Sequence, residues 1–467
     1  MSFKIAYLSI ILLTITLTLI SLLVSFGKTP SQSPTTQITE EHSLATQGSK
    51  PNLNPTLPPQ SKEINFFYEK IPMSKFHSPD ATWWGYNQTK IARFGDYVFM
   101  YVINNQDNDN KTLSSLQIYK KYKDNAWEKG ASFPTSRPGN ILLDSNGGLH
   151  TFVFEPTDVA TNDSIGSLKH YYFPNAKSGD ITNYQTEVVI EGDGSNETVN
   201  IRVGAAISRD DVMTLGFGLT TFNPLYQGHS EHLYFKKPTD SSWNHLIAGE
   251  NLGHDFFYPF VLSSGTSFYL LPVQDDFAGL GNPNIYQKIM LLEYVNNTWR
   301  KEIITDLTAH QLASTRPRLL EQSELFEDQK GKLHIIYKEF LDPSSPYPVS
   351  SFKHLVRDGE RWKTDLVDTD GKNIQWVRLI DIGVRLYYLI STPNSLFLKS
   401  LGSGKIMELD LPNQVQSIYP YLSSPKTGTK DSEPYIDILA ITADKNEYSS
   451  SASFYLRIPK SEFSKLD

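Results

Sequence analysis

The sequence predicts an all-β protein, specifically a β-propeller of seven four-stranded blades preceded by one N-terminal transmembrane helix. Three observations favour this fold class. After residue 62 the chain consists of short apolar runs between Gly, Asn, Asp and Pro, and no stretch has a long helical stripe of apolar residues. A strand pair with a tryptophan at its turn recurs every 56 to 63 residues, for example from Trp243 to Trp299 and on to Trp362. A second strand pair alternates with the first.

The N-terminal segment, residues 1–27, is predicted to be a membrane anchor. Ala6–Phe26 contains no charged residue and, as a helix, would reach roughly 30 Å, the thickness of the hydrocarbon core. A cleaved signal peptide is the alternative, but its apolar region is usually about 7–15 residues long and ends in a small-residue cleavage site. Lys4 lies before the span, which favours a cytoplasmic N-terminus. We therefore expect a single-pass protein of the cell membrane with its C-terminal part extracytoplasmic, or secreted if the segment is cleaved.

Residues 28–62 are predicted to be a disordered linker. The segment is rich in Ser, Thr, Pro, Gln and Asn, as in TPSQSPTT and PNLNPTLPP, and contains few large apolar residues. Such a composition buries too little surface to offset the entropy of ordering. Its prolines favour a semi-extended spacer between the anchor and the domain that follows.

Residues 63–467 are predicted to form the propeller. The tryptophan-bearing strand pair appears in four copies, LQIYKKYKDNAWEKG (Leu116–Gly130), HLYFKKPTDSSWNHLIA (His232–Ala248), IMLLEYVNNTWRKEII (Ile289–Ile304) and FKHLVRDGERWKTDLV (Phe352–Val367). The alternating pair includes the hairpin turns DSNGG and DQKGK, in which Gly provides a positive φ. Two hairpins per unit make a four-stranded blade.

Seven blades fit the length of this region. At about 58 residues per unit its 405 residues correspond to seven blades, and six is the alternative. The last strand, Ser453–Lys460, lacks a partner after it, and Ile64–Pro72 is predicted to supply that strand and close the ring. Closure would remove exposed sheet edges, which promote aggregation.

Two hairpins carry a motif that resembles a known family. The pattern D-x-x-G-x-L-H occurs at Asp144–His150 and at Asp328–His334 and resembles the inner hairpins of sialidase-like (BNR-type) propellers. The Asp-box of that family, S-x-D-x-G-x-T-W, is degenerate or absent, because KDNAW, TDSSW and VNNTW have the acid or amide three residues before Trp rather than five. The resemblance therefore covers residues 63–467 as an architecture.

Arginine and aromatic residues stand where the innermost strands are predicted to begin. Because these strand starts face the central channel on one rim, they are expected to converge and to bind a ligand there. The predicted ligand-binding residues are Arg137, Arg202, Tyr258, Arg316, Trp376 (or Arg378) and Tyr419, and the first copy lies near Trp83, Trp84 and Tyr86. Guanidinium groups bind carboxylates and aromatic faces stack on sugars, so the pattern indicates an anionic glycan.

The resemblance to sialidases adds roles for some of these residues. It implies that Arg137, Arg202 and Arg316 surround a substrate carboxylate, and that Tyr258 or Tyr419 acts as the nucleophile. His254 and Asp255, which precede Tyr258, are the other candidates for acid–base catalysis. A purely structural interpretation competes with this one: Arg-Pro and Tyr-Pro at a strand start set the direction of the chain and satisfy loop carbonyls.

Three functions remain open at this point: a surface-displayed module that binds glycans or proteins, an enzyme (glycoside hydrolase or polysaccharide lyase) acting on acidic glycans, and a protein-interaction platform in a cell-envelope assembly. The net charge of −8 with scattered basic residues argues against nucleic-acid binding. The chain has no cysteine, P-loop, H-E-x-x-H or G-x-S-x-G, so we expect neither a cofactor nor a metal. The sequence does not determine the oligomeric state.

Overall fold

The computed structural model describes residues 63–71, 85–105, 114–135, 138–158, 162–191, 197–199, 203–223, 226–249, 255–275, 286–308, 320–340, 350–367, 373–411, 418–423, 433–442 and 453–467. Contacts divide the chain into two compact units, Met1–Gln60 and Ser61–Asp467, and every described residue lies in the second. None of the helices in these residues has the length and apolar character needed to cross a membrane. The predicted anchor, residues 1–27, and the linker, residues 28–62, lie outside the described residues.

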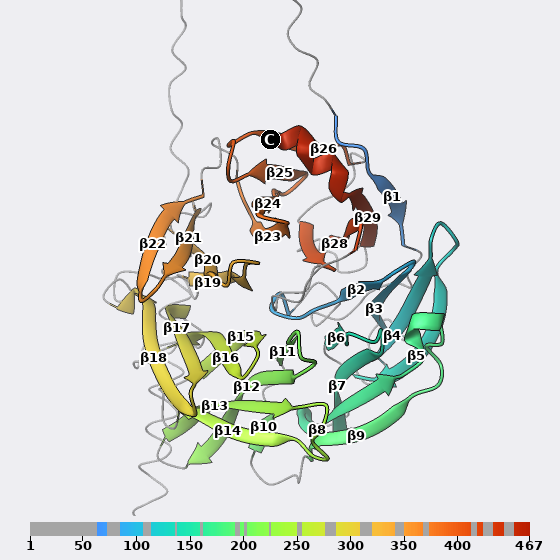
Figure 1. The fold of residues 1–467 in the computed structure, drawn as a ribbon. Helices are drawn as coiled ribbons and strands as arrows, with labels where there is room; N and C mark the ends of the chain where they lie inside the picture. Colours follow the sequence, from blue (N-terminus) through green and yellow to red (C-terminus); the bar gives the residue numbers. More distant parts are fainter. Residues whose placement is uncertain are drawn as a thin grey trace, which may run out of the picture. The chain divides into compact units, whose positions relative to one another are not determined.

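The second unit consists of seven antiparallel sheets arranged as blades (Figure 1), so the prediction of seven blades is confirmed and the alternative of six is wrong. Blade 1 contains β2 (Ile91–Phe94), β3 (Tyr97–Asn105), β4 (Ser114–Tyr122) and β5 (Glu128–Pro134). Blade 2 contains β6 (Asn140–Leu143), β7 (Leu149–Asp158), β8 (Asn162–Phe173) and β9 (Gln185–Ile190), with the short 3-10 helix η2 (Ala176–Ser178) before β9. Blade 3 contains β11 (Gly204–Ile207), β12 (Met213–Asn223), β13 (Tyr226–Lys236) and β14 (Asn244–Gly249), and β10 (Glu197–Val199) also pairs with β12.

The remaining blades follow the same order. Blade 4 contains β15 (Asp255–Ser264), β16 (Ser267–Asp275), β17 (Tyr286–Val295) and β18 (Thr298–Asp306). Blade 5 contains β19 (Leu320–Glu327), β20 (Leu333–Phe340), β21 (Ser350–Asp358) and β22 (Arg361–Leu366). Blade 6 contains β23 (Trp376–Ile382), β24 (Arg385–Ser391), β25 (Leu396–Ser400) and β26 (Ile406–Leu409). Blade 7 contains β27 (Ile418–Leu422), β28 (Tyr435–Thr442), β29 (Ser453–Pro459) and β1 (Phe67–Lys70), followed in the chain by the 3-10 helix η4 (Lys460–Leu466).

The ring closes in the way the sequence predicts. The strand β1 pairs with β29, so the N-terminal end of the domain supplies the outer strand of the last blade. The innermost strands contact one another in the order β2, β6, β11, β15, β19, β23 and β27, and β27 contacts β2. The helix η4 buries Phe463 and Leu466 against this closing blade.

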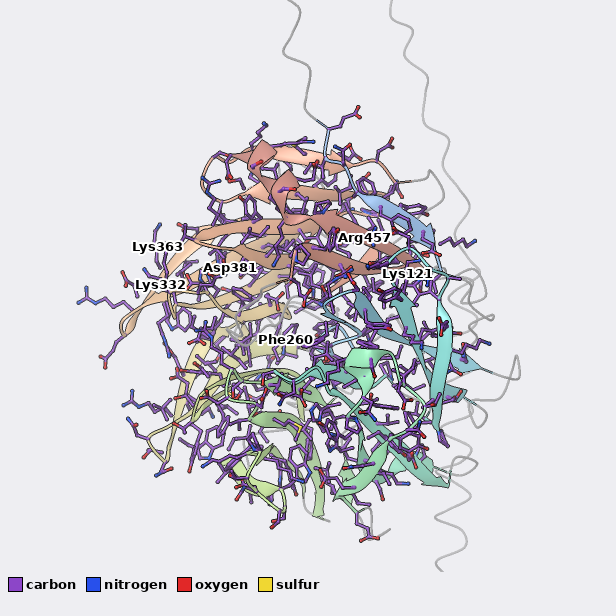
Figure 2. All side chains as sticks on the ribbon, turned by 45° about the vertical axis from the view of Figure 1, so that its right-hand side comes forward. Lys121, Phe260, Lys332, Lys363, Asp381 and Arg457 are labelled. Atoms are coloured by element: carbon purple, nitrogen blue, oxygen red, sulfur yellow. The ribbon has the colours of Figure 1, made fainter. Side chains whose placement is uncertain are left out.

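Burial falls from the axis outwards, as the strand sequences require. The innermost strand β19 is buried along nearly its whole length, whereas the outer strand β22 is largely exposed. One apolar cluster lies between each pair of neighbouring blades, so the core is divided among the blade contacts. Figure 2 shows Phe260 near the middle of the domain and Lys332 and Lys363 projecting at its edge.

Each of the four recurring tryptophans contacts the blade that precedes its own. Trp127 of blade 1 packs edge-on against Tyr455 of blade 7, with 5.2 Å between ring centroids. Trp362 of blade 5 donates its indole N–H to Glu302 of blade 4 at 2.8 Å. The repeat therefore places a large, partly polar side chain where it bridges two blades.

The D-x-x-G-x-L-H motif is explained by its turn. In blade 2, one carboxylate oxygen of Asp144 accepts the backbone N–H groups of Asn146 and Gly148, at 2.9 and 2.8 Å. Gly147 has φ of 80°, a value that favours glycine. The other oxygen of Asp144 faces the Nε2 atom of His150 at 3.3 Å. The motif therefore builds a capped hairpin with a histidine directed at the capping carboxylate.

Candidate functional site

The aromatic residues predicted at the strand starts meet at one end of the axis. Tyr86, Tyr258, Trp376 and Tyr419 form this group, called the axial cluster below. The ring of Tyr86 lies 5.0 Å from that of Tyr258 and 4.8 Å from that of Trp376, and the rings of Trp376 and Tyr419 are 5.5 Å apart. Four blades or their connections thus contribute side chains to one rim.

Most of the axial cluster is buried. Tyr258, Tyr86 and Trp376 are 2%, 6% and 7% exposed, and the hydroxyl of Tyr86 donates to Oε1 of Gln322 at 3.1 Å. Only Tyr419 is partly exposed. Tyr258 also has φ of 51°, an unusual value for a bulky residue, beside a bulge where β15 pairs with β16. The axial cluster therefore forms a packed support at this rim. The backbone of this support is strained at Tyr258.

Arg378, the alternative to Trp376 in the predicted ring, has a structural role. Its guanidinium donates to the backbone carbonyls of Tyr86 and Ser323, both at 2.6 Å, and to that of Pro420 at 3.2 Å. The residue is 3% exposed. Arg378 thus joins three separate segments near the axis, which is the role that the structural reading of the strand-start arginines assigns to it.

The other predicted site residues are placed only in part. Arg137, Arg202, Arg316, His254, Trp83 and Trp84 lie outside the described residues. Asp255 begins β15, where it pairs in register with Asp275 of β16. The described residues thus bring together Tyr258, Trp376 and Tyr419 and leave the arginine ring as a prediction.

A separate cavity of about 460 Å³ lies on the opposite rim, between blades 2 and 3. Each blade begins with its innermost strand, so the strand starts share one rim and the turns that follow them share the other. This side cavity is lined by residues of such turns and of the outer strands, namely Asp144, Asn146, His150, His170, Tyr172, Gln185, Thr186, Glu187, Asp211, Met213, Lys236, Lys237, Pro238 and Asp240.

A row of four titratable groups forms the inner wall of the side cavity. Nε2 of His150 faces Asp144 at 3.3 Å, Nδ1 of His150 faces Nε2 of His170 at 2.9 Å, and Nδ1 of His170 faces Glu187 at 2.8 Å. Nδ1 of His170 faces a carboxylate and donates its hydrogen to it, so Nε2 of the neutral His170 ring accepts a hydrogen from Nδ1 of His150. The row is therefore a chain of hydrogen bonds that ends at Glu187.

The surroundings disfavour a positive charge on His170. Burial lowers the pKa of His170 to about 4, although its hydrogen bond to Glu187 acts in the opposite direction. The hydrogen bond from His170 lowers the pKa of Glu187 to about 2, and Lys236 adds to the effect by donating to Glu187 at 2.7 Å. Glu187 also accepts the indole N–H of Trp243 at 3.1 Å. The sequence motif contains His150, but His170 and Glu187 become its neighbours only through strand register.

Glu231 is a buried acid that sequence reasoning missed. It lies in β13 opposite Gly218, and neither carboxyl oxygen has a hydrogen-bond partner in the part of the chain that the structure describes. Burial raises its pKa well above the usual value of 4.5. Burial therefore disfavours the ionised form of this side chain, which costs free energy at neutral pH.

Replacing Glu231 with methionine is expected to stabilise the protein. A polar side chain buried without a hydrogen-bond partner costs about 1–3 kcal/mol even when neutral, and an apolar side chain of similar size avoids this cost. The gain should shrink as the pH falls to 4.5, where the unfolded chain is also protonated. Urea unfolding at pH 7 and at pH 4.5 measures the difference in free energy of unfolding between the variant and the unaltered protein. Glu408→Met, at an exposed position of β26, is the control and should change stability by no more than about 0.5 kcal/mol.

The described residues contain no group of three or more His, Cys, Asp or Glu side chains that could hold a metal ion. In the row described above, each carboxylate is already engaged with protein donors.

No protein-family model matches the sequence, and no curated protein matches it. Among solved structures, the polysaccharide lyase Uly1 is similar with a TM-score of 0.51 and 10% identity, over 85% of this chain and 92% of that one. A family PL25 ulvan lyase bound to -[GlcA(1-4)Rha3S]- has a TM-score of 0.50 and 12% identity, over 85% and 96% of the two chains. The likeness at these identities concerns the fold, so the resemblance to sialidase-like propellers is confirmed only as a propeller architecture.

Proposed function

We propose that this protein is held at the cell membrane by residues 1–27 and displays a propeller outside the cytoplasm that binds an acidic polysaccharide at its axial rim. The observation that carries the proposal is the likeness in fold, over 85% of the chain, to two polysaccharide lyases. One of these is bound to a saccharide that contains glucuronate and a sulfated rhamnose. An acidic glycan is also the ligand that arginines and aromatic residues at the strand starts would favour.

The described residues of the axial rim form a rigid support for such a site. Tyr86, Tyr258 and Trp376 are packed together, and Arg378 holds the segments around them through three backbone carbonyls. In this proposal the packed side chains position Tyr419 and the strand-start arginines Arg137, Arg202 and Arg316, whose positive charges bind a uronate or a sulfate. A rigid support lowers the entropy lost on binding.

A lyase is the second candidate, favoured by the fact that both similar structures are polysaccharide lyases. In β-elimination a base removes the proton beside the uronate carboxylate, the bond to the 4-oxygen breaks, a C=C bond forms, and the leaving oxygen is protonated. The arginines would neutralise the carboxylate, and His254, Asp255 or Tyr258 would transfer the protons. The product absorbs ultraviolet light, so turnover is directly observable.

The double variant Arg137→Ala/Arg316→Ala is expected to lose binding to acidic polysaccharides by roughly tenfold per arginine, because each removes a charge-assisted contact. Full-length protein in a sugar-free detergent is measured against uronate-rich, sulfated and neutral polysaccharides at two salt concentrations. Binding should weaken as salt rises. Ultraviolet absorbance on the same samples separates a lyase from a binder.

Arg300→Ala/Arg361→Ala makes the same charge change at exposed positions of outer strands and should bind like the unaltered protein. Failure of the intact protein to bind acidic polysaccharides would contradict the proposal and favour a protein-interaction platform. Loss of folding in the Arg137/Arg316 variant would show that these arginines are structural.

A further inference from the structure

Blades 2 and 5 contain the same histidine pair in different surroundings. In blade 5, Asp328 faces Nε2 of His334 at 3.3 Å, and Nδ1 of His334 faces Nε2 of His354 at 2.9 Å, matching Asp144, His150 and His170 of blade 2. In both blades the second histidine follows the first by 20 residues and lies on the third strand. The repeat therefore offers an internal comparison of one motif at two places.

The neighbouring blade fills the space in one case only. At blade 5, Tyr388 of β24 packs in the cluster between blades 5 and 6, and its hydroxyl lies 2.7 Å from Nδ1 of His354. At blade 2, the residue of β12 that matches Tyr388 in register is Leu215, which has no hydroxyl and packs in the cluster between blades 2 and 3. The side cavity of about 460 Å³, lined by Met213 of the same strand, opens beside the histidine pair.

An open space is not required by the motif, because blade 5 shows the same motif closed by one tyrosine. Leaving such a space unfilled forgoes packing that the tyrosine provides at blade 5. Its volume is within the range of about 300–1,000 Å³ that is typical of small-molecule sites. The open form at blade 2 therefore needs a reason, and binding a ligand supplies one.

We propose that the side cavity is a binding site for an uncharged, hydroxyl-rich ligand, specifically a neutral oligosaccharide of two or three sugars. This site lies on the rim opposite the axial cluster and takes a different chemical class of ligand. The proposal therefore does not rest on the function proposed for the axial rim, and the two can fail independently.

The charges of the lining exclude an anionic ligand. Four carboxylates, those of Asp144, Glu187, Asp211 and Asp240, face two lysines, Lys236 and Lys237, which leaves the wall net negative. The carboxylates are occupied by protein donors: Asp211, for example, accepts the backbone N–H and the hydroxyl of Ser145, at 2.8 and 2.6 Å. A cation therefore finds no open carboxylate pair, and an anion is repelled.

The remaining side chains suit hydroxyl groups. Asn146, Gln185 and Thr186 line the cavity at exposed positions, and within the described residues their side chains make no hydrogen bond. Amides and hydroxyls can donate and accept at once, as sugar hydroxyls do. The ring of Tyr172 stacks on His150 with centroids 4.6 Å apart and adds an aromatic wall.

Met213→Tyr tests the proposal by placing a large side chain in the cavity that Met213 lines. Full-length protein in a sugar-free detergent is screened by saturation-transfer NMR against neutral di- and trisaccharides of glucose, galactose, mannose, xylose and rhamnose, with a glucuronate-containing disaccharide as the acidic comparison. We expect at least one neutral oligosaccharide to bind, and to bind at least about tenfold more weakly to Met213→Tyr, a loss of about 1.4 kcal/mol.

Leu386→Tyr places the same large side chain at the register-equivalent position of blade 6, away from the cavity, and should bind like the unaltered protein. Gln185→Trp obstructs the cavity from the exposed end of β9 and provides a second blocking variant if Met213→Tyr does not fold. Arg137→Ala/Arg316→Ala should leave this binding intact. The proposal is overturned if no neutral oligosaccharide binds, if both blocking variants bind normally, or if the acidic disaccharide binds better than the neutral ones.

Discussion

The protein is expected to lose several kcal/mol of folding stability as the pH falls from 6.5 to 4, because three of its histidines are buried in a neutral form. Burial lowers the pKa of His170 and of His232 to about 4, and that of His354 to about 3, from the ordinary value of 6.5. Each of the three lies against a second histidine, at 2.9 Å for His170, 2.7 Å for His232 and 2.9 Å for His354.

The direction of the effect follows from proton uptake. Between about pH 4 and 6.5 the unfolded chain binds protons at these residues and the folded chain does not, so stability rises with pH in this window. The stabilisation is complete above pH 6.5 and is lost as the pH falls toward the folded pKa values. At 1.36 kcal/mol per pKa unit, His170 alone accounts for about 3 kcal/mol. Three such residues reach the order of the whole stability of a typical domain.

Urea unfolding of the full-length protein, followed by tryptophan fluorescence at several pH values between 7.5 and 4.5, measures this slope. His354→Gln removes one titrating group and should flatten the curve, and His42→Gln, in the predicted linker, is the matched control. A stability that stays level between pH 6.5 and 4.5 would show that the buried pairs take up protons without penalty, contrary to the prediction.

The blade number was predictable because the sequence repeats the blade's own chemistry. In four blades a tryptophan recurs at the turn into the outer strand, where it contacts the preceding blade, as Trp127 and Trp362 do. The closing strand was predictable because Ser453–Lys460 would otherwise leave an open edge. Its observed form is shorter than expected: β1 covers Phe67–Lys70 within the predicted Ile64–Pro72.

The contacts between strands were harder to predict than the strands. The histidine pairs depend on register: His170 pairs with Phe152 in the ladder and lies diagonally across from His150. One signal was present in the sequence, since both D-x-x-G-x-L-H motifs are followed by a second histidine 20 residues after the first. The side cavity had no such signal, because it depends on which residue, Leu215 or Tyr388, the next blade presents to the histidine pair.

The axial rim illustrates a different difficulty. A strand-start residue can point into the channel as a ligand contact or bind backbone carbonyls as a brace, and the sequence looks the same in both cases. Arg378 is a brace because the carbonyls of Tyr86, Ser323 and Pro420 surround its guanidinium. Only the surroundings of the other strand-start arginines decide which role each has, and the Arg137/Arg316 variant tests it.

A buried ion pair between the first and last blades is the second large determinant of stability. Arg93 of β2 donates Nε and Nη2 to the two carboxylate oxygens of Asp437 of β28, at 2.6 and 2.7 Å. Asp437 is fully buried and also accepts the hydroxyl of Tyr455 at 2.6 Å. The two residues of the pair are 344 positions apart in the chain, and they connect the first and last blades where the ring closes.

Asp437→Asn is expected to destabilise the protein by about 3–5 kcal/mol, because it leaves the charge of Arg93 buried without compensation. Asp358→Asn breaks an exposed ion pair with Lys332 and should cost no more than about 1 kcal/mol. Urea unfolding at pH 7.5 compares the two, since the buried histidines are neutral in both folded variants at that pH. The double variant Arg93→Leu/Asp437→Leu should recover part of the loss, because no unpaired charge is then buried. If Asp437→Asn costs no more than Asp358→Asn, the β1–β29 pairing and the apolar cluster between blades 7 and 1 hold the ring closed without the ion pair.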